Sequence, residues 1–171
     1  NLSKKEIKQA MVAFFELGSA LQQRRQWSKM IKHYQSFARR FKRVDKGYLI
    51  RAYTLTGNAY VNQPKRYRDH RRARGAYQQA VKAYKSIPKS ARKDLPLEAR
   101  SAAAEALFKL ATYEFNQVKK IEFTKVRKTK DVKRHIKMVQ KNVQKLNKKM
   151  AKVKKSYEEV LSLNVESWGL A

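Results

Sequence analysis

Apolar residues recur along most of the chain at steps of three and four positions, which is the period of an amphipathic α-helix. Ser3 and Glu6 stand three residues apart at the start of the first stripe, the spacing of a capping box. Valine-rich alternating runs, which would indicate strands, are nearly absent. The pattern therefore predicts an all-α protein built from helical pairs. The expected pairs cover residues 3–42, 49–88 and 97–163.

The most regular apolar stripe lies near the end of the chain, where we expect one long amphipathic helix over about 131–163. Its steps alternate between four and three residues, the heptad pattern of a helix that packs against another helix. The stripe consists of Val132, Ile136, Val139, Val143, Leu146, Met150, Val153, Tyr157 and Val160. We expect it to pack on another helix of this chain, on a partner or on a second copy.

Composition narrows the classes of function. The 171 residues predict one domain, 1–171, with a sizeable core. The absence of cysteine excludes disulfides and thiol nucleophiles, and the three histidines match no metal-ligand spacing. The five glycines form no phosphate-binding loop. We therefore expect a protein that is not an enzyme and uses no cofactor or metal, and the short apolar runs predict no membrane span.

The charge is strongly basic, because 42 Lys and Arg against 13 Asp and Glu give a net charge of +29. Bases crowd the segment 66–74 and the last helix, where Asp131 is the only acid among residues 124–157. The candidate polyanion-binding residues are Arg66, Arg68, Arg71, Arg72, Arg74, Lys137, Lys141, Lys145, Lys148 and Lys152. Such clusters attract nucleic-acid phosphates, anionic lipid or acidic protein, and the alternative is a solvated face.

The helical pairs resemble tetratricopeptide repeats, whose unit of about 34 residues has large and Leu-Gly positions on its first helix and small residues and proline on its second. The matching positions are Phe14, Leu17 and Gly18 in the first pair, Tyr53, Gly57, Tyr60, Ala80 and Pro88 in the second, and Leu107, Leu110 and Ala111 in the third. Trp168 resembles the start of a further repeat at 166–171. The phrases AAEALFKLATYEF and KKSYEEVLSLNVESWGLA resemble degenerate repeats of delta-proteobacterial envelope and gliding-motility proteins.

The resemblance implies a right-handed solenoid of helical hairpins that binds a protein or peptide, in the periplasm or envelope. A cytoplasmic location is the alternative. Because the chain starts at Asn1 rather than Met, we expect the natural protein to be longer. The family's binding-groove positions can be transferred to this sequence one by one. They fall on Phe15, Ser19, Gln22, Arg51, Thr54, Asn58, Asn62, Phe108, Thr112 and Asn116. Arg51 and Asn58 would clamp a peptide carboxylate, or be part of an ordinary polar face. Nucleic-acid binding through the basic residues is the alternative function.

Overall fold

The computed structural model describes residues 3–41, 45–119 and 132–163, and every regular element in these ranges is helical, which confirms the all-α prediction. The further repeat expected at 166–171 lies outside them. A short 3-10 turn, Lys65–Tyr67, precedes α4. The α-helices are α1 (Lys4–Gln23), α2 (Trp27–Arg40), α3 (Lys46–Asn62), α4 (His70–Lys85), α5 (Lys89–Arg92), α6 (Leu97–Lys119) and α7 (Val132–Leu161).

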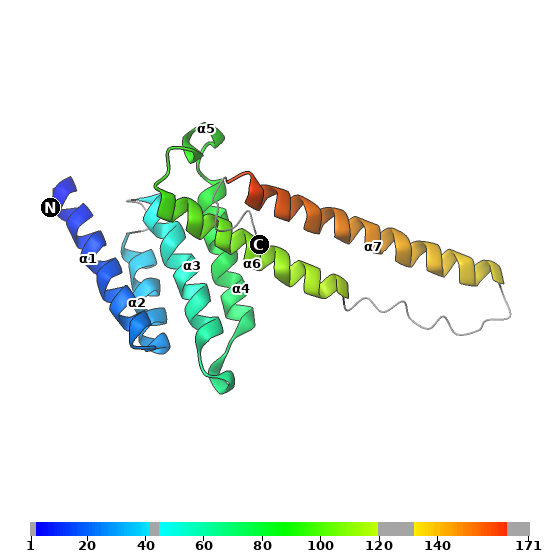
Figure 1. Ribbon diagram of the computed structural model, residues 1–171, viewed down its shortest axis with the longest axis horizontal. Helices are drawn as coiled ribbons and strands as arrows, with labels where there is room; N and C mark the ends of the chain where they lie inside the picture. Colours follow the sequence, from blue (N-terminus) through cyan, green and yellow to red (C-terminus); the bar gives the residue numbers. More distant parts are fainter. Residues whose placement is uncertain (1–2, 42–44, 120–131, 164–171) are drawn as a thin grey trace.

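The longer helices pack on their neighbours in the sequence. α1 packs on α2, α2 on α3, and α3 on α4, so the first four helices make a row. α6 then crosses both α3 and α4 and pairs with α7, which runs back alongside it (Figure 1). α7 extends beyond the Lys119 end of α6, as Figure 1 shows.

Helix starts are fixed by polar side chains that accept otherwise unpaired backbone N–H groups. Ser3 Oγ accepts from the Glu6 N–H and Glu6 Oε2 accepts from the Ser3 N–H, which confirms the capping box. Asp45 accepts from the Tyr48 N–H at 3.1 Å. Because Asp45 caps it, α3 begins three residues before the expected boundary at 49.

Two glycines let the helices approach closely. The fully buried Tyr34 ring of α2 lies against Gly18 of α1, and the fully buried Tyr77 ring of α4 lies against Gly57 of α3. Both glycines belong to the predicted repeat positions. At each of these two contacts a large aromatic ring is therefore set against bare backbone.

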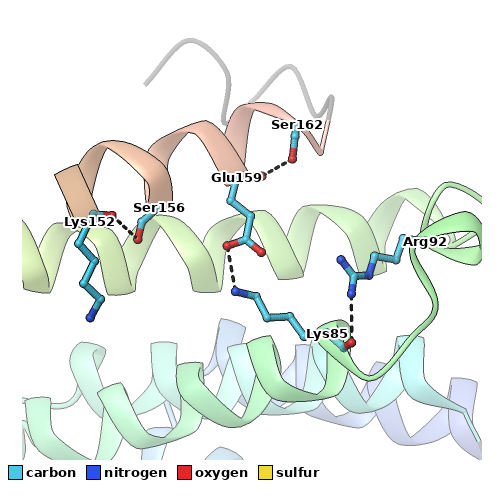
Figure 2. A network of polar contacts seen from close by, with 6 residues as sticks. All are labelled: Lys85, Arg92, Lys152, Ser156, Glu159 and Ser162. Carbon is cyan, nitrogen blue, oxygen red and sulfur yellow. Dashed lines mark hydrogen bonds and ion pairs between the residues drawn. The ribbon is translucent and has the colours of Figure 1, made fainter.

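Polar contacts hold the α7 end against the rest of the stack. Figure 2 shows Lys85 of α4 reaching Glu159 of α7, with 2.9 Å between Nζ and Oε2. Arg92 of α5 donates to the carbonyl oxygens of Lys85 and Ile87 at 3.0 and 2.9 Å. The Arg92 bonds hold the segment between α4 and α6 together, and the Lys85–Glu159 pair links the end of α4 to α7.

Candidate functional site

The structure distributes the predicted groove residues over several environments. Phe15 and Thr54 are buried, and Thr54 Oγ1 donates to the Ala102 carbonyl oxygen at 3.0 Å. Neither side chain is therefore available to a partner. Ser19, Gln22 and Asn62 are instead brought together, since all three line one open hollow between the α1–α2 turn and the end of α3.

Arg51 and Asn58, the proposed carboxylate clamp, are both engaged within the fold. The Arg51 guanidinium lies 4.5 Å from the centre of the Phe15 ring. The Asn58 amide donates to Glu105 Oε1 at 2.9 Å and accepts from the Tyr77 hydroxyl at 2.7 Å. The donor and the acceptor of this amide thus serve the packing of α3 between α4 and α6.

The expected groove residues of the third pair lie on α6. Phe108 is half-buried and meets the Tyr157 ring of α7 edge-on, with 5.8 Å between centroids. Thr112 Oγ1 donates to the Phe108 carbonyl oxygen at 2.9 Å, and Asn116 is exposed. Phe108 therefore helps to hold α7 on α6.

The arginine-rich segment is exposed, as its charge predicts. It comprises Arg66, Arg68, Arg71, Arg72 and Arg74. Asp69 Oδ1 accepts from the Arg72 N–H at 2.8 Å, and its other oxygen lies 3.4 Å from Arg72 Nε. Asp69 thus starts α4 and offsets the charge of Arg72. The other exposed arginines lie before the helix, at Arg66 and Arg68, or in its first turns, at Arg71 and Arg74.

The two predicted basic clusters meet at a cavity of about 270 Å³ between α4, α6 and α7. Arg74 comes from the arginine-rich segment and Lys152 from α7, and Lys149 adds a third cation. Val118 and Val153 supply apolar walls. Because Arg74 and Lys152 lie far apart in sequence, only the packing of three helices shows this convergence.

Tyr113 and Glu114, which also line this cavity, were not predicted from the sequence, whereas Lys149 is one of the basic residues of the predicted last helix. Glu114 Oε1 pairs with Lys152 Nζ at 2.6 Å, while its Oε2 is buried without a hydrogen-bond partner in the described ranges. Burial raises the pKa of the Tyr113 hydroxyl, and Arg74 lowers it in part. The position of Lys149 beside the apolar stripe can be read from the sequence. Nothing in the sequence predicts that α6 lies beside Arg74.

The apolar stripe of α7 is covered over only part of its length. Val153 and Val160 are 4% and 3% exposed, so the C-terminal part packs as the heptad pattern predicts. Val132, Ile136 and Val143 are 67%, 49% and 38% exposed. We expected the whole stripe to pack on another helix. Among the described residues, only the part toward the end of α7 does so.

The N-terminal part of this stripe, called the open stripe below, borders a strongly basic helix surface. It consists of Val132, Ile136, Val139, Val143, Leu146 and Met150, of which Val139 and Leu146 are half-buried. Lys141, Lys148 and Lys155 recur every seven residues and line the opposite face. The predicted residues Lys137, Lys141, Lys145, Lys148 and Lys152 are all exposed. α7 carries no acidic residue before Glu158.

In the described ranges, no His, Asp and Glu side chains gather in a group that could hold a metal ion. None of the helices described is both long and apolar enough to cross a bilayer. Comparisons of the chain with protein-family models, with curated proteins and with solved structures find no significant match.

Proposed function

We propose that the chain is a non-catalytic scaffold of tetratricopeptide-like hairpins that binds another protein. The open stripe of α7 carries this proposal. Exposed apolar side chains in an unbroken heptad register are the surface on which another helix packs. A nucleic-acid backbone is bound by cations and hydrogen-bond donors and gains little from such a stripe.

The place of the scaffold in a bacterial envelope or motility assembly is part of the same proposal. It is supported by the sequence resemblance of the phrases around 103–115 and 154–171. The hollow lined by Ser19, Gln22 and Asn62 offers a second polar surface to a partner, because residues from the first two helical pairs converge there.

Nucleic-acid binding is the second candidate function, and one specific observation favours it. Arg74, Lys149 and Lys152 meet at the cavity beside the basic face of α7. A phosphate backbone laid there would contact cations from two helices at once. The apolar stripe has no part in this alternative, so the two functions predict different responses to salt and to charge removal.

Binding to random-sequence duplex and single-stranded nucleic acid across a salt series distinguishes the scaffold function from nucleic-acid binding. The scaffold proposal predicts weak binding that falls steeply with salt and is lost near about 0.15 M, because only diffuse charge attraction contributes. Tight binding that persists at this salt concentration, with a preference for one nucleic acid, would overturn the proposal.

Two variants of equal net charge sharpen this test. One replaces Lys137, Lys141, Lys145 and Lys148 on α7 with Gln. The matched control replaces four exposed lysines on α1 and α2 with Gln: Lys5, Lys8, Lys29 and Lys32. The scaffold proposal predicts that both variants weaken nucleic-acid binding by similar factors. A much larger loss in the α7 variant would support a nucleic-acid site on α7 and contradict the scaffold proposal.

A further inference from the structure

The open stripe continues an interface that the fold already uses. Val153 and Val160 belong to the same heptad register and are buried where α6 lies beside α7. α6 ends at Lys119, whereas α7 extends past that end (Figure 1). A second helix placed beyond the end of α6 would therefore meet a stripe with the register and side-chain sizes of an existing helix–helix contact.

Charge decides which kind of helix fits the stripe. α7 carries no acid before Glu158, and its lysines flank and oppose the apolar positions. A second copy would place two such basic helices side by side, and like charges at that distance are repulsive. A helix whose apolar face is bordered by Asp and Glu would neutralise the lysines while it covers the stripe.

The cavity at the inner end of the open stripe supplies an anchor for an acidic side chain. Val153 forms part of the cavity wall. The cavity therefore adjoins Met150, the last exposed residue of the open stripe. Glu114 already pairs with Lys152 at 2.6 Å. Arg74 and Lys149 are the lining cations for which the described residues provide no ion-pair partner, and a carboxylate would satisfy them.

We propose that the open stripe and this cavity together dock an amphipathic helix of another protein whose apolar face is bordered by acidic residues. The inference rests on the proposed scaffold function and names its surface and the chemistry of its partner. The apolar contacts supply affinity that salt does not remove, and the charge pairs supply selectivity and a fast encounter.

A synthetic peptide probe tests the proposal on the full chain. The probe is a labelled helix of about four heptads with Leu at the seam positions and Glu beside them. Its control has the same composition in scrambled order and presents no apolar face. In fluorescence anisotropy we expect the helical probe to stay bound at about 0.15 M salt, where charge attraction is screened, and the scrambled peptide to dissociate.

Substitutions in the stripe locate the contact. Ile136→Gln with Val143→Gln should weaken probe binding by about tenfold or more, the factor expected when two apolar contacts are lost. Leu97→Gln with Leu161→Gln is the matched control, since both leucines are exposed and lie off the stripe. Arg74→Gln with Lys149→Gln should also weaken binding. Equal affinity of the stripe variant and wild type would overturn the proposal.

Light scattering and thermal melting of the same variants identify other occupants. A dimer in the wild type that becomes a monomer in the stripe variant would show that a second copy covers the stripe. A stripe variant that melts well below the wild type would show that the chain covers the stripe itself. Either result overturns this inference. If the probe does not bind and nucleic-acid binding is also weak, the docking inference fails while the scaffold proposal stands.

Discussion

At the scale of single residues, the fold depends on glycines that face buried tyrosine rings. A Cβ added at Gly57 would lie 2.5 Å from a Tyr77 ring carbon, and Tyr77 is 0% exposed. Because protein interiors are close-packed, a fully buried ring moves only if its neighbours also shift. A side chain at Gly57 must therefore push α3 away from α4.

Gly57→Ala should lower the free energy of unfolding by about 1–3 kcal/mol, because overpacking outweighs the gain in helix propensity. Gly75→Ala is the control, since it lies inside α4 with nothing within 4 Å of the added Cβ. It should raise stability by about 0.5–1 kcal/mol. Urea denaturation measures both values, and equal shifts would contradict the packing argument.

Glu105 gives the stability a defined pH dependence. Burial raises the pKa of its carboxyl group, and the hydrogen bond from Asn58 and the charge of Lys109 offset this in part. The unfolded chain therefore releases this proton at lower pH than the folded chain does. The resulting penalty is absent below the unfolded pKa, grows as the pH rises and is complete above the folded pKa.

Glu105→Gln should remove this penalty and keep a carbonyl oxygen that accepts from Asn58. We expect the variant to be more stable than the wild type at about pH 7, with a difference that shrinks as the pH falls toward about 4, near the ordinary pKa of Glu. Denaturation curves over this range measure the difference. A constant difference across the range would contradict the argument.

The sequence predicts residue roles well where they depend on near neighbours. The Ser3–Glu6 capping box follows from local spacing, and the small-residue positions Gly18 and Gly57 follow from the resemblance to the repeat. The engagement of Asn58 by Glu105 does not, because the two residues lie 47 positions apart. The sequence suggests that the Asn58 amide is available to a ligand. In the tertiary structure the amide instead forms hydrogen bonds with Glu105 and Tyr77.

At the scale of elements, the heptad stripe predicts α7 but not which part of it is packed. The spacing is identical at both ends, whereas burial depends on where α6 stops. Because α6 ends at Lys119, Val160 is 3% exposed and Val132 is 67% exposed. The open stripe is therefore a property of the α6–α7 pair and not of the α7 sequence.

Alanine substitutions at the two ends of the stripe should separate its parts. Val160→Ala removes buried methyl groups and should lower the free energy of unfolding by about 1–2 kcal/mol. Val132→Ala should change it by less than about 0.5 kcal/mol, as at other exposed sites. Similar losses measured by urea denaturation would show that both ends are packed.

At the scale of the whole molecule, the charge of +29 acts against the compact state. Composition alone predicts this repulsion and the attraction to anions. It does not predict that Arg74 and Lys152 line one cavity, because that requires α4, α6 and α7 to pack together.

Added salt should therefore stabilise the isolated protein. Raising NaCl from about 0.02 to about 0.3 M shortens the screening length several-fold and weakens repulsion among the lysines of α7. We expect the melting temperature, followed by circular dichroism, to rise by a few degrees, or about 1 kcal/mol of stability. A constant or falling melting temperature would show that repulsion does not limit stability.

Amide hydrogen exchange along α7 tests the central claim most directly, because the protection of each turn reports how firmly that turn is packed. We predict that amides of residues 132–143 exchange at least about tenfold faster than those of residues 153–160 in the free protein. Adding the acidic helical probe should then slow exchange at residues 132–143 above all. Equal protection of both segments in the free protein, or no protection by the probe, would contradict an open docking surface on α7.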